Sequence, residues 1–287
     1  MLTFKNKNDL SRSAVKGGAN LVYGLNSLGA SALIKQWVSP PLHMSKAHQE
    51  DGFTISQLLS PTAGLLQGDL LEVEVSVQEN TKAAVISPAA CRIHSMDSGY
   101  AHIKQAYSVE KGGFLDVWTA PLILQSESKL KQETALHVAN GGCMLFCEII
   151  APGRSAFGER FAFDQWESNT RIYNNGTLIN YENFTCEPQK GDVRDWQEAF
   201  PEGNYASMYL INDRDFNGFI AEMHQIETPD AVIGLSDLNR AGLGIKILAK
   251  DGVSLRKTII SLRERLFKEL KLVIPPSLNR SQSFFFN

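Results

Sequence analysis

Residues 71–77 read LEVEVSV, an uninterrupted alternation of apolar and polar side chains. In an extended chain, Leu71, Val73, Val75 and Val77 lie on one face, and the glutamates and the serine lie on the other. This alternation is typical of a β-strand that buries one face against a core. The stretch therefore predicts a sheet protein, and the sequence around it continues the pattern.

Turn signals separate several further apolar runs. Glu-Asn at residues 79–80 and Gly-Gly at residues 112–113 and 141–142 each precede such a run, and Asn-Gly at residues 175–176 separates two more. Asn-Gly and Gly-Gly supply the positive φ angles that tight hairpins require. From residue 57 to residue 184 we therefore expect short antiparallel strands and little helix.

The last third of the chain has a helical period. Ser254 is the expected N-cap of a helix that should stop at residues 275–276, which are both proline. A shorter helix is expected over residues 216–225, with residues 212–213 as cap candidates. The apolar positions of the longer helix recur every three or four residues, at Leu255, Ile259, Leu262, Leu266 and Leu270.

Together these signals predict a mainly β protein. We expect layers of multi-stranded antiparallel β-sheet and a small C-terminal helical subregion with two α-helices. The 287 residues are interpreted as one domain, with a β-rich part at 1–210, a helix-containing part at 211–276 and an irregular tail at 277–287.

Composition narrows the classes of function. The 28 Lys and Arg residues against 31 Asp and Glu residues give a net charge of −3, which removes the commonest reason to propose nucleic-acid binding, a basic field. The first residues lack the apolar core of a signal peptide, and no run approaches the ~18 apolar residues of a membrane span. We expect a cytoplasmic protein that does not enter a membrane.

Preformed metal and nucleotide sites are not visible in the sequence. Its four cysteines contain no CxxC pair, and its six histidines contain no HxH or HExxH motif, so no zinc or nickel cage is indicated. No Walker A loop, dinucleotide fingerprint or GxSxG elbow occurs. The cysteines are interpreted as small buried apolar residues in a reducing compartment.

One residue contradicts its surroundings. Glu148 lies in CMLFCEII, residues 143–150, a strand whose composition indicates burial on both faces. An isolated carboxylate there costs several kcal/mol, so it must be paired, protonated or facing a wet cavity. Arg154 and Arg160 are candidates for a structural ion pair. Asp69 follows a glycine turn, where a hydrogen bond to the backbone is the simpler interpretation.

Six segments of the chain form a distributed pattern: SPPLHM (39–44), LLSPTAGLLQGD (58–69), SPAACRIHS (87–95), DVWTAPLIL (116–124), FCEIIAPGR (146–154) running into GERF (158–161), and LRERL (262–266). Taken in this order, they resemble the UreD (UreH) family of urease accessory proteins, and the resemblance runs from about residue 40 to residue 276. Three positions depart from the family pattern: Gln67 stands where Gly is usual, Cys91 where Ser or Thr is usual, and Arg92 where Lys is usual.

The resemblance implies a non-enzymatic maturation factor with a mostly β fold. Such a protein binds apo-urease subunits and UreF, and meets the nickel-carrying GTPase UreG through UreF. Ni²⁺ is then cargo that passes through an internal polar tunnel, and no cofactor is bound permanently. The residues carried over by motif as transient tunnel candidates are Asp69, Cys91, Glu148, Glu159 and Glu182.

The residue types in this chain suit a passage for Ni²⁺ better than a tight Ni²⁺-binding site. A passage needs sites that admit an ion and also release it. Scattered carboxylates meet that demand, whereas clustered His or Cys would retain Ni²⁺. Two alternatives stay open. One is a β-rich interaction scaffold without ion passage, and the other is a carboxylate-based hydrolase that uses Glu148 and Glu159 as acid and base.

Overall fold

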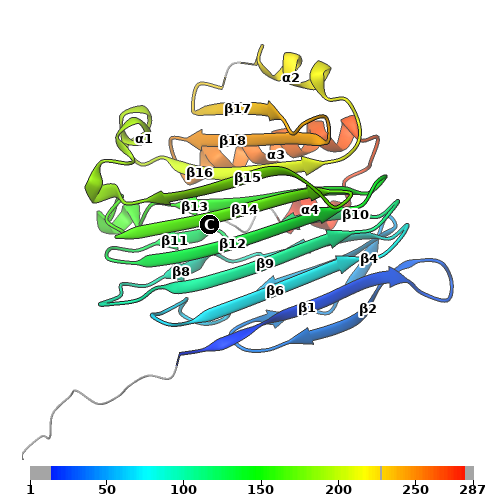
Figure 1. Ribbon diagram of the computed structural model, residues 1–287, viewed down its shortest axis with the longest axis horizontal. Coiled ribbons are helices and arrows are strands. Elements are labelled where there is room, and N and C mark those ends of the chain that lie inside the picture. Colours follow the sequence, from blue (N-terminus) through cyan, green and yellow to red (C-terminus); the bar gives the residue numbers. More distant parts are fainter. Residues whose placement is uncertain (1–13, 227, 282–287) are drawn as a thin grey trace, which may run out of the picture.

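The computed structural model describes residues 14–226 and 228–281, and in this range the protein is mainly β (Figure 1). The strands form two sheets, one with seven strands and one with eleven. In order across the seven-stranded sheet these are β15 (Thr177–Cys186), β14 (Gln165–Asn174), β12 (Lys129–Val138), β9 (Ala101–Val109), β6 (Leu70–Val77), β1 (Lys16–Leu25) and β2 (Ser31–Val38).

The eleven-stranded sheet packs against the first. Its main path runs through β17 (Ala231–Asp237), β18 (Gly242–Ala249), β16 (Asn204–Ile211), β13 (Cys143–Ala151), β10 (Phe114–Trp118), β7 (Lys82–Ile86), β5 (Phe53–Leu59) and β3 (His43–Met44). Three short strands join it at the side: β4 (His48–Glu50) pairs with β5, while β11 (Leu122–Leu124) pairs with both β13 and β8 (Cys91–Ile93).

The expected antiparallel arrangement is wrong for much of the molecule, where strand orientation is mixed. Strands β6, β9, β12 and β14 run parallel to one another in the seven-stranded sheet, and β7, β10 and β13 run parallel to one another in the eleven-stranded sheet. The chain alternates between the sheets, so each turn of this coil adds one strand to each sheet in the same direction. A local turn signal does not show which sheet the next strand will join.

The turn at residues 175–176 is a hairpin, as expected, because it joins the antiparallel strands β14 and β15. The other three turns instead connect strands of different sheets and stack on one another. The Asn80 N–H donates to the Lys111 carbonyl, and the Gly112 N–H donates to the Gly141 carbonyl, both at 3.1 Å. Asn80, Gly112 and Gly141 all have positive φ, so the predicted turn chemistry is present but serves a crossing between layers.

Helix α3 (Gly252–Glu269) covers the outer face of the eleven-stranded sheet, and its buried residues include Leu255, Ile259, Leu262 and Leu266, as the sequence predicts. Its cap differs from the prediction: Asp251 is the N-cap and accepts a hydrogen bond from the Ser254 N–H at 2.7 Å. Three other α-helices occur in the described residues, where the sequence predicted one: α1 (Arg194–Ala199), α2 (Asn217–Met223) and α4 (Pro276–Ser281).

The details of the C-terminal third depart from the expected ranges. Strands β17 and β18 lie inside the part expected to contain helices. Helix α3 ends at Glu269, before the expected stop at residues 275–276, and α4 begins at Pro276, the second proline of that pair. Phe216 precedes α2 without a side-chain cap, so residues 212–213 do not cap it. The expected irregular tail begins with α4, and residues 282–287 lie outside the described residues.

Candidate functional site

Polar side chains cross the space between the two sheets and separate two apolar regions. On β12, Leu130 belongs to one apolar region and Leu136 to the other, while Gln132 and Thr134 lie between them. Neighbouring strands repeat this change at the same level. We call this layer the internal polar band; it consists of Gln105, Gln132, Thr134, Glu148, Ser168, Thr170, Glu182, Ser207 and Lys246.

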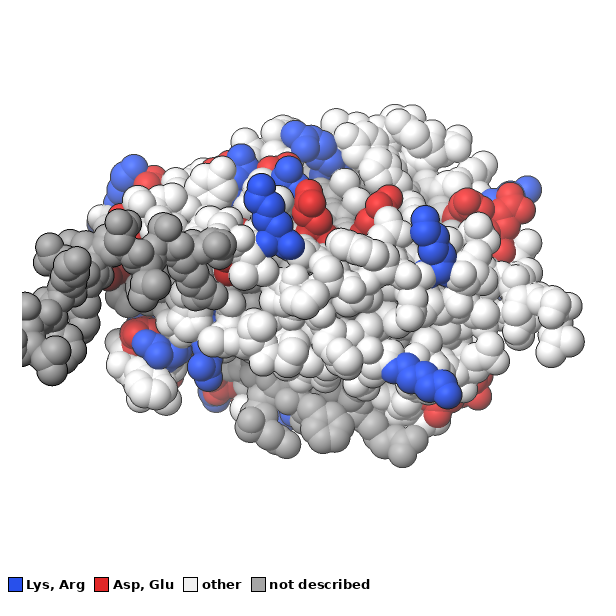
Figure 2. All heavy atoms as spheres, turned by 90° about the horizontal axis from the view of Figure 1, so that it is seen from below, with Lys and Arg blue, Asp and Glu red and all other residues white. Residues whose placement is uncertain are grey.

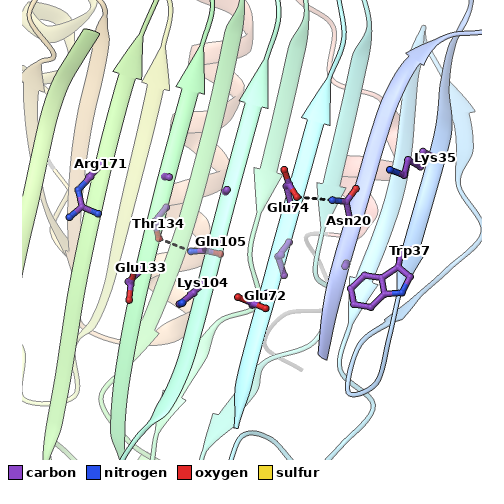
Figure 3. Close-up of a pocket in the computed structure, with 14 residues that line it drawn as sticks. Asn20, Lys35, Trp37, Glu72, Glu74, Lys104, Gln105, Glu133, Thr134 and Arg171 are labelled. Atoms are coloured by element: carbon purple, nitrogen blue, oxygen red, sulfur yellow. Dashed lines mark hydrogen bonds between the residues drawn. The ribbon is translucent and has the colours of Figure 1, made fainter. Parts of the chain in front are cut away.

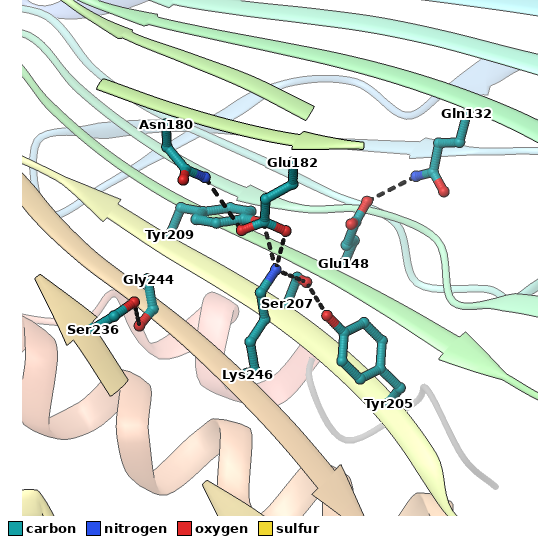
Figure 4. Close-up of polar contacts among 10 residues, drawn as sticks. All are labelled: Gln132, Glu148, Asn180, Glu182, Tyr205, Ser207, Tyr209, Ser236, Gly244 and Lys246. Atoms are coloured by element: carbon teal, nitrogen blue, oxygen red, sulfur yellow. Dashed lines mark hydrogen bonds and ion pairs between the residues drawn. The ribbon is translucent and has the colours of Figure 1, made fainter. Parts of the chain in front are cut away.

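Strand register builds the band from two rows. In the seven-stranded sheet, Gln105, Thr134, Thr170 and Glu182 are cross-strand partners on β9, β12, β14 and β15. In the other sheet, Glu148, Ser207 and Lys246 are partners on β13, β16 and β18. Gln132 and Ser168 form a further pair on β12 and β14. Hydrogen bonds from Gln132 to Glu148 and from Lys246 to Glu182 join the two sheets (Figure 4).

Glu148 is the most deeply buried carboxylate of this band, with only 4 % of its surface exposed. Its Oε2 accepts a hydrogen bond of 2.7 Å from the Gln132 side-chain amide. Burial raises the pKa of Glu148 to about 7, and the charge of Glu182 adds to this, although Lys246 and the bond from Gln132 act in the opposite direction. The carboxyl group is therefore close to half ionised near neutral pH.

Lys246 and Glu182 form the outer part of the band. The Lys246 ammonium donates to Glu182 at 2.5 Å, to Tyr209 at 2.6 Å and to Ser207 at 2.8 Å. Burial alone would raise the pKa of Glu182, but the charge of Lys246 and its hydrogen bond outweigh burial and lower that pKa. Burial likewise opposes the charged form of Lys246, yet Tyr205, Glu182 and Glu148 raise its pKa. The pair is ionic at neutral pH.

Gln132, the bonded partner of Glu148, also lines a small cavity. The cavity has a volume of about 70 Å³, and its other walls are formed by Gln105, Tyr107 and Cys91 together with apolar residues, two serines and a threonine. This volume has room for a few water molecules, and the amide and hydroxyl groups give them hydrogen-bond partners. Burial raises the pKa of Cys91 to about 11, so this wall of the cavity carries a neutral thiol.

Asp69 lies away from these contacts and holds a turn. Its two carboxylate oxygens accept hydrogen bonds from the backbone N–H groups of Val15 and Leu66, at 2.8 and 2.9 Å. This is the backbone role expected from the glycine turn that precedes it.

The arginines proposed as partners of Glu148 have other partners. Arg154 binds Glu159 through two hydrogen bonds, and Arg160 pairs with Glu202. That part of the prediction is wrong because the strand ends at Ala151 and the following loop directs both guanidinium groups to residues of loops. Glu159 is therefore held in its own ion pair, and the structure brings together only Glu148 and Glu182 among the four acidic candidates.

Comparison with known proteins identifies the family of this chain. The family model for the UreD urease accessory protein matches residues 15–280. The chain belongs to the UreD family. The urease accessory protein UreD of Opitutus terrae is 30% identical over 247 residues, which cover 83% of this chain and 89% of the relative. UreH of Helicobacter hepaticus is 28% identical over 225 residues, which cover 78% of this chain and 87% of the relative.

Sequence reasoning on this UreD-family chain missed Lys246, Gln132 and Ser207. Lys246 carried a usable signal, because a lysine inside the apolar strand β18 is as anomalous as the glutamate inside β13. Gln132 and Ser207 gave no such signal, since uncharged polar residues are common in strands. In the described part of the chain, no three His, Cys, Asp or Glu side chains gather as a metal-binding group.

The outer face of the seven-stranded sheet carries a groove of about 820 Å³ (Figure 3). Its floor is low because Ala106 and Ala135 are cross-strand partners in the middle of the sheet. Charged side chains, among them Glu72, Lys104 and Glu133, lie along it. The row through the floor runs across all seven strands as Trp37, Asn20, Glu74, Ala106, Ala135, Arg171 and Tyr181.

A second surface carries exposed apolar side chains. Figure 2 shows the molecule from below, the side on which β1 and β2 lie in Figure 1, and its charged side chains lie mainly across the upper part and at the sides of the view, with fewer in the middle of the described surface. Leu25, Leu28, Ile34 and Trp37, on β1, β2 and the turn between them, are exposed. Exposed apolar patches of this kind are typical of protein-contact surfaces. Within the described residues, none of the helices combines the length and apolar character needed to cross a membrane.

Proposed function

We propose that this chain is a non-catalytic urease accessory protein of the cytoplasm. It binds apo-urease subunits and UreF, meets UreG through UreF, and passes Ni²⁺ along the internal polar band. The observation that carries this proposal is Glu148, a carboxylate that is 4 % exposed and bonded not to an arginine but to the amide of Gln132, which lines a cavity.

The chemistry of Glu148 suits an ion in transit. A site on a passage must attract the ion and also release it. With a pKa of about 7, the carboxyl group is divided between a protonated form and an ionised form that attracts a cation. Oxygen ligands without clustered His or Cys bind Ni²⁺ less strongly than a nitrogen or sulfur cage would. Glu148 therefore fits a temporary stop better than a storage site.

The test is Glu148→Gln, which keeps the shape of the side chain and its bond from Gln132 but removes the charge. Urease co-expressed with the variant and the companion accessory proteins should contain roughly tenfold less nickel, the scale expected for losing a supporting charge at a metal pathway. Metal analysis of purified urease measures this. Glu167→Gln, on the exposed face of β14, is the matched control. Normal nickel content with a folded Glu148→Gln variant would contradict the passage.

A second function, an interaction scaffold without ion passage, is favoured by the groove on the seven-stranded sheet. Exposed Trp37 and Tyr181, 55 % and 51 % exposed, are the aromatic type that contributes most to protein interfaces. If scaffolding is the whole function, Glu148→Gln will leave nickel loading unchanged and a variant that fills the groove will abolish it.

The hydrolase alternative requires two carboxylates that face one pocket. Glu148 bonds to Gln132 and Glu159 to Arg154, so each carboxylate has a separate set of partners. This arrangement supports the non-catalytic proposal.

A further inference from the structure

Lys246 occupies an unusual place for a lysine. It lies on β18 between cross-strand partners, in the same row as Ser207 and Glu148 of the eleven-stranded sheet. Glu182 reaches it from β15, the edge strand of the other sheet. The ammonium group therefore sits between the two layers, at the point where both rows of the polar band meet (Figure 4).

Exposure increases along the band towards Lys246. The side chains of Lys246 and Glu182 are 36% and 28% exposed, while Glu148 is 4% exposed. A solvated cation that enters the band from this end meets the Lys246–Glu182 pair before it reaches Glu148. Lys246 is thus at the mouth of the band, and Glu148 is in its interior.

The three N–H groups of an ammonium can be matched one by one here. Glu182, Ser207 and Tyr209 each place an oxygen within 2.8 Å of the Lys246 nitrogen. No N–H of Lys246 is left for Glu148. Lys246 therefore affects the pKa of Glu148 only through its charge. Because carboxylate and hydroxyl oxygens also bind divalent cations, the ammonium holds a position that such a cation would otherwise fill.

We propose that Lys246 is a built-in competitor of the transported ion. Its ammonium occupies the oxygen ligands at the mouth of the polar band, so that a divalent cation enters only by displacing it and does not stay. This inference rests on the proposed passage of Ni²⁺, and it assigns to Lys246 the role of setting how weakly the band holds its cargo. Without the lysine, Glu182 and Glu148 become a pair of uncompensated carboxylates.

The test is the binding of NiSO₄ to the purified full-length chain, measured by calorimetry without urease present. Lys246→Met and Lys246→Gln should bind Ni²⁺ at least about tenfold more tightly than the unchanged chain, because each removes the competing charge. Lys246→Arg keeps the charge and should not gain affinity. Adding Glu182→Gln to Lys246→Met should cancel the gain. Circular dichroism checks folding, and Lys246→Gln, which keeps an uncharged N–H donor at this position, decides the test if Lys246→Met does not fold.

Two results would overturn the proposal: no gain in the folded Lys246→Gln variant, or an equal gain in Lys246→Arg. The measurement is separate from the test of the passage itself. If Glu148→Gln leaves nickel loading of urease normal while Lys246→Gln still gains affinity, the passage is wrong, and Lys246 only weakens cation binding at Glu182 without acting on a transported ion. If Glu148→Gln stops loading and Lys246→Gln gains nothing, the passage stands and Lys246 has no such role.

Discussion

At the scale of single residues, two glutamates near Lys246 have pKa values that are shifted in opposite directions. Glu182 bonds directly to Lys246 and its pKa is lowered despite burial. Glu148 has only the amide of Gln132 as a bonded partner among the described residues, and burial raises its pKa to about 7. The difference follows from geometry, because the ammonium has three N–H groups and none of them points to Glu148.

The raised pKa of Glu148 predicts a pH-dependent stability. The folded chain holds a proton on this group up to about pH 7, whereas an ordinary glutamate releases it near 4.5. The folded state binds more protons in this window, so the contribution is fully present below pH 4.5 and is lost as the pH rises through about 7. Its total size is about 3 kcal/mol.

Urea unfolding at pH 5 and pH 7.5 measures this contribution when the unchanged chain is compared with Glu148→Gln. The variant should gain stability relative to the unchanged chain as the pH rises, by roughly 2 kcal/mol over this interval. Glu167→Gln, on the outer face of β14, is the matched control for removing a carboxylate from the sheet. A constant difference between Glu148→Gln and the unchanged chain at the two pH values would contradict the raised pKa.

At the scale of elements, local pattern predicts the strands and the long helix but not how the strands pair. The alternation in β6 and the period of three and four in α3 are physical consequences of the two backbone geometries. Strand β6 forms where it is predicted, while α3 contains the predicted apolar face but begins earlier and ends at Glu269, before the predicted stop. Whether two strands run parallel or antiparallel does not depend on local sequence. The turns at 112–113 and 141–142 have the positive φ angles of a hairpin but cross between sheets, since the partner of each strand is distant in sequence.

At the start of α3, a prediction can decide whether Asp251 or Ser254 is the N-cap of the helix. Asp251 accepts the Ser254 N–H, so Asp251→Ala should reduce the free energy of unfolding by about 1 kcal/mol. Ser254 lies inside the first turn, and Ser254→Ala should change it by less than about 0.5 kcal/mol. Urea or thermal unfolding of the two variants measures this. A larger loss of stability in Ser254→Ala than in Asp251→Ala would show that Ser254 is the N-cap.

At the scale of the whole molecule, the candidate site exists only after the sheets assemble. The sequence identifies Glu148 because a carboxylate is anomalous in an apolar strand, and the resemblance adds Glu182. It cannot identify Gln132, because that residue becomes significant only when β12 faces β13 across the interior. Nor can it show that Glu159 is paired with Arg154, although the glycine turn did indicate the backbone partners of Asp69. The single-domain interpretation stays a prediction.

The two faces of the seven-stranded sheet allow docking and passage to be separated. Its inner face carries part of the polar band, while its outer face carries the groove above Ala106 and Ala135. Ala135→Tyr should fill the groove without harming the strand, because tyrosine is favourable in β-strands. If a partner in urease maturation occupies the groove, this variant should lower its co-purification on the order of tenfold, the effect of losing a central contact.

Val232→Tyr is the matched control for that variant, since Val232 is 59 % exposed on β17, the edge strand of the other sheet. It introduces the same side chain away from the groove and should leave co-purification unchanged. Glu148→Gln should also leave it unchanged, because the altered group is inside the molecule and reaches no partner surface. Loss of partner binding in Ala135→Tyr alone, together with loss of nickel loading alone in Glu148→Gln, would show that one sheet performs two independent tasks on its two faces. Undiminished co-purification with folded Ala135→Tyr would remove the groove as the docking site and leave the apolar edge at β2 as the next surface to test.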